Sequence, residues 1–233
     1  MMHSSYRSLG GIEQGAKGLF DAFFDMLGEN GTLILPAFSY DTVGYDSPAF
    51  DRQNTPSCVG FLPEFFRTSV PDVVRSMHAT HSCSAKGRRA DELTKDHIFD
   101  LTPVGKNSPI AKLPHVDGKI LFLGCSPNHN TAMHGVEELV RPMYLFDDQP
   151  IRYVLKDGDF TVEQTAIRHS FSKNGIFYDQ QYVRIIDLLS PEDCRCGKVL
   201  DAECYLLSAK AVWEVGYQKL LENPFYFVKA IPE

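Results

Sequence analysis

Residues 121–141 read LFLGCSPNHNTAMHGVEELVR, and the rest of the chain is organised around them. Its first residues predict a buried strand, Gly-Cys-Ser-Pro predicts a turn, and a polar loop leads into a helix that begins near Thr131. In open α/β sheets, reactive groups gather where the carboxyl end of a strand passes into the next helix, because backbone N–H groups and side chains converge there on a cleft. The stretch therefore predicts an α/β fold with a site at this junction.

Two side chains near the start of this helix suggest a general base. His134 and Glu137 are three residues apart, so on a helix they share a face and the carboxylate can orient the imidazole. The same residues also fit an ordinary helix start, with Thr131 or Asn130 as the cap and Glu137 as a surface charge. The spacing alone leaves both interpretations open.

Length and charge limit the class of protein. A chain of 233 residues with 43% hydrophobic and 23% charged residues is typical of a soluble globular protein. Its formal net charge of -7 argues against binding to nucleic acid or an anionic membrane, and it suits a cationic small molecule. No apolar run approaches the roughly 18 residues of a spanning helix, and the first residues, MMHSSYRSLGG, lack the pattern of a secretion signal. We expect a cytoplasmic protein.

Motifs for other chemistries are absent from the sequence. Metalloprotease helices need two histidines four apart with an adjacent Glu, or a second His where Glu138 stands, and neither pattern occurs, so we expect no metal. A GxSxG elbow and a GxGxxG fingerprint in a strand-to-helix context are also absent. Cys125 stays open as a thiol nucleophile beside His134, although its place after a strand favours packing. Without CxxC spacing, the expected state of the cysteines is reduced: Cys58, Cys83, Cys125, Cys194, Cys196 and Cys204.

The remaining periodicity predicts a layered α/β fold. A strand ending at Ser4 and Ser5, a helix over 13–27 and a buried strand over 32–38 form its opening. Further helices are expected at 61–68, 90–97, 105–113 (with Ser108 as the cap) and 202–221. A strand is expected over 118–124, a hairpin turns at Asp157-Gly158, and residues 177–189 look like a strand.

Several motifs together resemble the aminoglycoside 3-N-acetyltransferase family, the antibiotic acetyltransferases that are distinct from the GNAT fold. The segments stand in the family's order and approximate spacing and span nearly the whole chain: MHSSYRSLG, GTLILPAFSYD, FDRQNTPSCVGFLPEFFR, RSMHATHSCSAKG, GKNSPIAKL, GKILFLGCSPNHNTAMHGVEE and ENPFYFV. The resemblance implies one domain over 1–233, with a three-layer mixed sheet flanked by helices and no metal. It also implies acetyl transfer from acetyl-CoA to the 3-amino group of an aminoglycoside.

The resemblance also assigns residues. The family's histidine–glutamate motif matches His134 and Glu137, which favours the general-base interpretation over the helix-start one. The family's Tyr-Asp after the second strand matches Tyr40 and Asp41, which would lie toward the acceptor. The family's hydroxyl-rich segments would line the coenzyme side, and here they match Ser4, Ser5, Ser76, His81, Ser82 and Ser108.

Four further residues complete the expected site. Thr131, one turn before His134, could donate to the developing oxyanion. Lys86 would contact the coenzyme phosphates, with Arg88 as the alternative. Glu138 would attract the polycationic acceptor. His169 would also bind the acceptor, and it is the next candidate for the base.

Two expectations concern the chain as a whole. Family members usually carry an N-terminal arm before the HSS motif, and this sequence begins almost at that motif, which would expose a sheet edge and weaken the coenzyme site. The alternatives to aminoglycoside acetylation are acylation of another amine, such as an aminosugar, and binding of coenzyme A or a sugar without turnover. A homodimer is left open.

Overall fold

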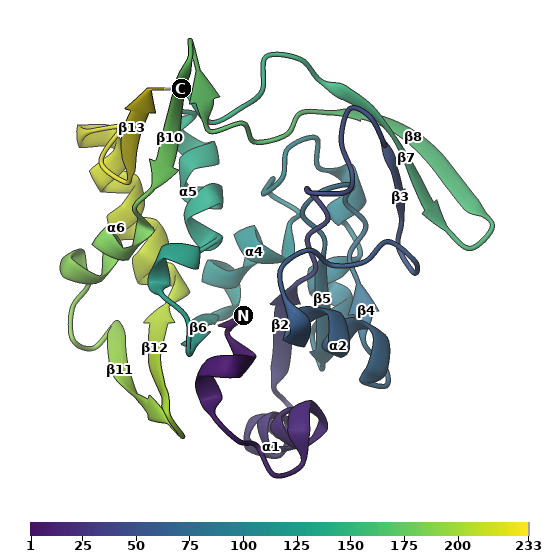
Figure 1. The fold of residues 1–233 in the computed structure, drawn as a ribbon, viewed down its shortest axis with the longest axis vertical. Coiled ribbons are helices and arrows are strands. Elements are labelled where there is room, and N and C mark those ends of the chain that lie inside the picture. The colour runs from purple at the N-terminus through teal and green to yellow at the C-terminus, as the bar shows by residue number, and fades with distance from the viewer. Residues whose placement is uncertain (233) are drawn as a thin grey trace.

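The computed structural model describes residues 1–232, which form a mixed α/β structure (Figure 1). Its α-helices are α1 (Gly15–Leu27), α2 (Phe61–Ser69), α3 (Ala90–Thr94), α4 (Pro109–Lys112), α5 (Ala132–Val140) and α6 (Ala209–Glu222). Its 3-10 helices are η1 (Tyr6–Leu9), η2 (His97–Phe99), η3 (Leu113–Val116), η4 (Pro127–His129) and η5 (Tyr182–Leu188).

One sheet positions the junction that the sequence singled out. Its strand order is β1 (Met2–Ser4), β6 (Lys119–Leu123), β12 (Ala202–Ser208) and β11 (Cys194–Val199). β1 runs parallel to β6 with Ser4 opposite Leu123, and β12 is antiparallel to both of its neighbours. Because parallel strands end at the same edge, the chain after Ser4 lies beside the chain after Leu123.

The other strands form three small sheets within the described residues. One contains β2 (Thr32–Pro36), β5 (Cys83–Gly87) and β4 (Val74–Arg75); another contains β3 (Ala49–Asp51), β7 (Ile151–Asp157) and β8 (Phe160–Ala166); the last contains β13 (Val228–Pro232), β10 (Ile176–Gln180) and β9 (Ser172–Lys173). The β7–β8 hairpin extends away from α5 and α6 in Figure 1. The expected mixed α/β class is confirmed, with the strands divided among small sheets.

Close packing fixes the helix that carries His134. A Cβ on Gly135 would lie 2.7 Å from Trp213 of α6 and 2.9 Å from Val104, so only glycine allows α5 to approach these neighbours so closely. Around this contact, Met133 and Val136 of α5 and Val212 of α6 are fully buried in the largest apolar cluster. The inner face of α5 is therefore held rigidly against α6.

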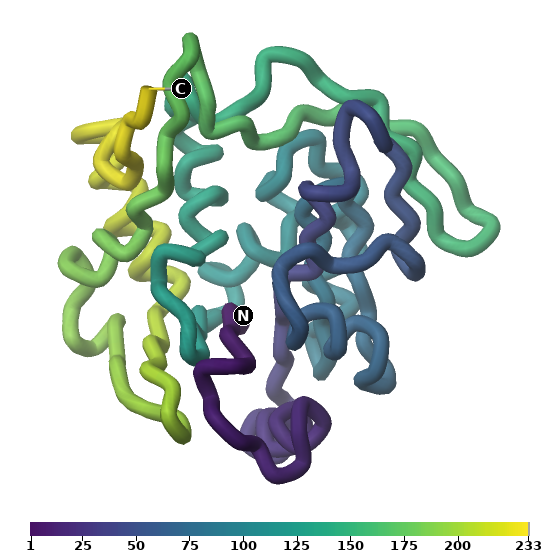
Figure 2. Tube along the Cα trace, in the orientation of Figure 1, coloured from purple at the N-terminus to yellow at the C-terminus, as the bar shows by residue number. Residues whose placement is uncertain are grey.

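The chain path in Figure 2 brings a distant segment to the same place. The green 3-10 helix η5 lies beside the teal η4, which directly precedes α5. Asn128 of η4 donates from its side-chain amide to Gln180 O at 2.8 Å and accepts from the Val183 N–H. These bonds anchor residues 180–183 next to the start of α5.

Most expected elements are confirmed, and two are wrong. Ser108 accepts a hydrogen bond from Ile110 N and caps α4, and the hairpin turns at Gly158, which has a positive φ. Residues 202–208 form strand β12, because pairing with β6 and β11 overrides the helical pattern, and the helix begins only at Ala209. Residues 182–188 form η5 and not a strand, since the extended segment ends at Gln180.

Two whole-chain features follow from the described residues. No helix in 1–232 is both long and apolar enough to cross a membrane. All six cysteines are free thiols, as expected. The single domain over 1–233 stays a prediction.

Candidate active site

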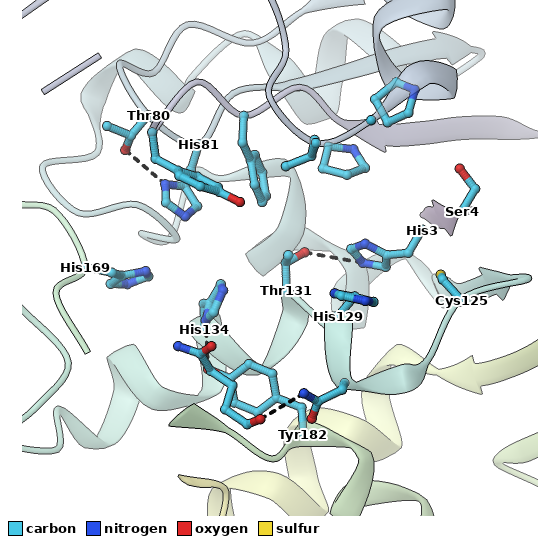
Figure 3. A pocket seen from close by; sticks show the side chains of 18 of the residues that line it. His3, Ser4, Thr80, His81, Cys125, His129, Thr131, His134, His169 and Tyr182 are labelled. Carbon is cyan, nitrogen blue, oxygen red and sulfur yellow. Dashed lines mark hydrogen bonds between the residues drawn. The ribbon is translucent and has the colours of Figure 1, made fainter. Parts of the chain in front are cut away.

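A cleft of about 1090 Å³ opens where β1, β2 and β6 end (Figure 3). Its lining comes from six parts of the chain: residues 3–7 around the end of β1, 36–40 around the end of β2, 59–63, 80–81, 125–134 after β6, and 168–182. The placement agrees with the rule that polar groups converge at the carboxyl ends of strands. We call the side formed by His81, His134 and His169 the histidine wall, and the side formed by Ser4, Ser5 and Arg7 the hydroxyl wall.

His134 is held from behind by a tyrosine and a carboxylate. The Tyr182 hydroxyl lies 2.9 Å from His134 Nδ1 and donates to Glu137 Oε2 at 2.6 Å. Because the only phenolic proton points to the carboxylate, the Tyr182 oxygen accepts from the His134 Nδ1–H. The lone pair of His134 is therefore on Nε2. Glu137 Oε2 is 3.6 Å from Nδ1, so Tyr182 bridges the pair that the sequence placed in direct contact.

Glu137 is fully buried, and its second oxygen is also satisfied. The Tyr144 hydroxyl donates to Glu137 Oε1 at 2.8 Å. Burial first, and then the charge of Glu137, raise the pKa of Tyr144 and of Tyr182 above the ordinary tyrosine range. Both phenols consequently keep their protons and act as donors. The interpretation of Glu137 as an exposed surface charge is wrong.

Glu138 faces the other flank of α5 and does not line the cleft. It accepts hydrogen bonds from the Thr102 hydroxyl, from Val104 N at 2.7 Å and from His169 Nε2 at 2.8 Å. Burial opposes ionisation of Glu138, but the bonds from His169 and the other donors outweigh it and hold the pKa below the ordinary value. Glu138 thus orients His169 and does not face the acceptor space directly.

His81 and His169 complete the histidine wall. His81 Nδ1 shares a hydrogen bond of 2.9 Å with the Thr80 hydroxyl. Burial, with neighbouring histidines second, holds the pKa of His81 well below its usual value. Burial likewise lowers the pKa of His169 even though Glu138 opposes the shift. Both rings are therefore neutral near pH 7.

The hydroxyl wall has fewer internal partners. Ser4 Oγ is buried and has no hydrogen-bond partner among the described residues. Ser5 Oγ bonds to Ser8 Oγ at 2.8 Å, and Arg7 is exposed and forms no ion pair within residues 1–232. Between the two walls, Thr131 Oγ1 lies 3.4 Å from His3 Nε2 at the start of α5. Unused donors on this side fit a ligand with phosphate and amide groups.

Several expected coenzyme contacts lie outside the cleft because the fold uses their polar atoms. Ser76 Oγ bonds His97 Nδ1 and accepts from Cys83 N, and Ser82 Oγ accepts from Arg75 and donates to Ala37 O. Ser108 caps α4 in a fully buried position. Lys86 donates to Pro71 O on the outer side of β5. These four residues therefore hold sheet and helix ends together in place of lining the cleft.

On the expected acceptor side, Tyr40 lines the cleft and Asp41 does not. Burial raises the pKa of Tyr40 to about 12, so its phenol stays neutral. Cys125 also lines the cleft, and burial raises the pKa of its thiol to about 11. A thiolate nucleophile at neutral pH is thereby disfavoured at Cys125.

Sequence reasoning missed Tyr182, Tyr144 and Arg7. Tyr182 is 45 residues from Glu137, and no local pattern connects them. Arg7 carried a usable signal, since it lies two residues after Ser5 at the strand end. Tyr144 follows α5 by one short turn, but its contact with Glu137 depends on how the chain reverses after Arg141.

The comparisons with known proteins agree with this geometry. The profile of the family described as Aminoglycoside 3-N-acetyltransferase matches residues 1–221. Aminoglycoside N(3)-acetyltransferase IV of Salmonella sp is 30% identical over 74% of this chain and 67% of its own length. Aminoglycoside N(3)-acetyltransferase III of Acinetobacter baumannii is 31% identical over 100% of this chain and 88% of its own length.

Solved structures give the same answer for the fold. AAC-IIIb in a binary complex with CoASH aligns with a TM-score of 0.78 at 25% identity, covering 95% of this chain and 89% of that one. A histidine-to-alanine variant of aminoglycoside acetyltransferase AAC(3)-IVa, in complex with a gentamicin, also has a TM-score of 0.78 at 25% identity, covering 97% and 82%. The motifs, the cleft and these matches agree, and the chain belongs to the aminoglycoside 3-N-acetyltransferase family.

Proposed function

We propose that this protein transfers the acetyl group of acetyl-CoA to the 3-amino group of an aminoglycoside, with His134 as the general base. The observation that carries the proposal is the pair of hydrogen bonds that link His134 Nδ1 through the Tyr182 hydroxyl to Glu137, from which the tautomer of His134 follows. Its Nδ1–H is engaged by Tyr182, and Nε2 is left with a lone pair on a ring that lines the cleft. A lone pair held in this way is what proton removal from an amine requires.

The amine must first lose a proton, because an ammonium group has no lone pair with which to attack a thioester. His134 Nε2 accepts this proton, and the ring becomes an imidazolium. The positive charge is then stabilised by Glu137, which is 3.6 Å from Nδ1 and linked to it through Tyr182. Because Glu137 is fully buried, its charge is poorly screened, which strengthens this stabilisation.

Thr131 is the candidate donor for the oxyanion that develops on the thioester carbonyl. It lines the cleft at the N-terminus of α5, one turn before His134. No side-chain capping bond occupies its hydroxyl, and its contact with His3 is a long one of 3.4 Å. The positive end of the α5 dipole acts in the same direction.

The hydroxyl wall fits the coenzyme. Acetyl-CoA supplies the thioester when bound, and family membership makes it the cosubstrate. The buried Ser4 Oγ without a partner and the unpaired guanidinium of Arg7 would hold amide and phosphate groups. Ser5 extends the same row of donors.

The opposite end of the cleft suits a polycationic sugar. Tyr40, Phe38 and Phe171 line it with aromatic faces, which attract sugar rings and ammonium groups. The net charge of -7, to which the nearby Asp41 contributes, favours approach of a polycation. His169, which lines the cleft, would contribute to acceptor binding directly, and Glu138 would contribute by orienting His169 from behind.

The test is a turnover assay with acetyl-CoA across kanamycin-like and gentamicin-like compounds, amino sugars and simple amines, with the product mapped by NMR. We expect acetylation at the 3-amino group of the aminoglycosides. Turnover confined to another amine would support the aminosugar alternative. If calorimetry shows that coenzyme A binds but no amine is acetylated, the result supports the alternative of a binding module without turnover. A cytoplasmic location and a homodimer stay predictions.

A further inference from the structure

Three imidazoles of the cleft face one another. The ring centroids of His81, His134 and His169 are separated by 5.1 Å (His134 to His169), 5.3 Å (His81 to His169) and 6.1 Å (His81 to His134). One nitrogen of each ring lies within 4.8 Å of one nitrogen of the other two. Figure 3 shows the three rings around one space on the same side of the cleft.

These separations are close to those of a three-histidine metal site. Zinc binds imidazole nitrogen at about 2.0–2.1 Å in tetrahedral geometry, which places the ligand nitrogens about 3.4 Å apart and the ring centroids about 5 Å apart. Two of the three centroid distances already match. The ligand nitrogens lie within 4.8 Å of one another, so metal binding needs the widest separation to close by at most about 1.4 Å.

Each ring also has one nitrogen held by a neighbour. The Thr80 hydroxyl bonds His81 Nδ1, the Tyr182 hydroxyl bonds His134 Nδ1, and the Glu138 carboxylate bonds His169 Nε2. Metal-binding histidines typically have such a partner, which fixes the tautomer and the ring orientation.

The three other nitrogens are available as ligands. They are Nε2 of His81, Nε2 of His134 and Nδ1 of His169, and no hydrogen bond within the described residues engages them. His169 Nδ1 is buried and without a partner in a side chain that is 3% exposed. A buried polar atom without a partner is destabilising unless a ligand satisfies it.

Nearby charge favours a cation at this point. Glu137 and Glu138 lie behind His134 and His169 and supply two carboxylates to balance a divalent charge.

We propose that His81, His134 and His169 form a binding site for a divalent transition-metal ion of the zinc class, with its fourth position open to the cleft. The ion would bind the same Nε2 of His134 that accepts the proton from the amine. Bound metal therefore inhibits acetyl transfer reversibly, and this second half of the proposal rests on the general-base role of His134.

Binding is tested with the metal alone. Zn²⁺ is titrated into the chelator-treated full chain in competition with a chelating dye, and Co²⁺ binding is followed by its visible absorption bands. We expect one ion per chain and the band intensity of a four-coordinate site. The His81→Ala and His169→Ala variants should each weaken binding by about a hundredfold or more, and Glu138→Gln by about 10- to 100-fold.

The matched control is His129→Ala, which removes a cleft histidine outside the cluster and should bind zinc like the parent. If an alanine variant does not fold, the corresponding glutamine variant (His81→Gln or His169→Gln) is titrated instead, because glutamine keeps most of the side-chain volume. A parent that binds zinc no more tightly than these variants overturns the site.

Inhibition is a separate measurement. Acetyl transfer should fall as Zn²⁺ occupies the site with the affinity found in the titration, and it should return when a chelator is added. Tight binding without inhibition would overturn the inhibitory half and count against His134 as the base, while the metal site would stand. Absence of binding would overturn the site and leave the proposed acetyl transfer untouched.

Discussion

The two walls of the cleft are built in different ways. On the histidine wall, each ring is fixed by a partner behind it, and Glu137 and Glu138 accept five hydrogen bonds between them from Tyr144, Tyr182, Thr102, Val104 and His169. On the hydroxyl wall, Ser4 has no partner and Arg7 has no counter-ion within the described residues. The difference fits the proposed roles, because proton transfer benefits from a preorganised wall, whereas a ligand can use the free donors of the other wall.

Replacement of His134 should have the largest effect on this comparison. His134→Ala removes the proton acceptor, so turnover should fall by about 10²- to 10⁴-fold while coenzyme A affinity stays within a factor of about two. The rise of the parent's rate with pH should disappear in the variant. Steady-state kinetics and calorimetry measure both quantities, and His115→Ala, at an exposed position of η3, is the control. If variant and parent have equal rates at every pH, His134 is not the general base, and His169 becomes the next candidate.

Acid should destabilise the fold through its buried histidines. Burial lowers the pKa of His78 to about 4 and of His3 to about 3, from 6.5. Between pH 6.5 and about 4, the unfolded chain binds protons that the folded chain does not, so the free energy of unfolding decreases as pH falls. The slope is up to about 1.4 kcal/mol per pH unit for each histidine. Urea unfolding at about pH 7.5 and about pH 5 measures it, and equal midpoints would contradict the prediction.

Glu137→Gln should have an intermediate effect. The amide still accepts a hydrogen bond from Tyr182 but lacks the charge that stabilises the imidazolium of His134. We expect turnover to fall by about 10- to 100-fold, with coenzyme A affinity nearly unchanged. A matched Tyr182→Phe variant retains the charge and removes the bridge. If Glu137→Gln is harmless and Tyr182→Phe is not, orientation and not charge is the main contribution.

A pair of serines should give the smallest effects and separate the walls most clearly. Ser4→Ala should weaken coenzyme A binding by a few fold, since one hydrogen bond contributes about 1 kcal/mol, and should leave stability unchanged because Ser4 Oγ has no partner in the protein. Ser108→Ala should do the reverse, lowering stability by about 1 kcal/mol through loss of the α4 cap. Calorimetry and urea unfolding on both variants test the pair. Loss of coenzyme A binding in Ser108→Ala would contradict this prediction and show that Ser108 contributes to the coenzyme site.

Local sequence patterns determined the parts of this protein whose contacts are close along the chain. Three features depend on neighbours within a few residues: the strand, turn and helix of residues 119–140, the Ser108 cap, and the β7–β8 hairpin. The local sequence was therefore sufficient to predict them. His134 and Glu137 share the helix, so their proximity could be predicted from a spacing of three, whereas the general-base interpretation needed the family resemblance as well.

Contacts between segments distant in the sequence could be identified only in the tertiary structure. Glu137 and Glu138 are adjacent in sequence but face opposite flanks of α5, one toward Tyr182 and the other toward His169. Residues 202–208 form a strand because one partner strand lies on each side, β6 on one and β11 on the other. The three rings of the histidine wall come from positions 81, 134 and 169, and no spacing motif could reveal them. Such contacts depend on packing between elements, and packing is a property of the whole chain that leaves no local signal.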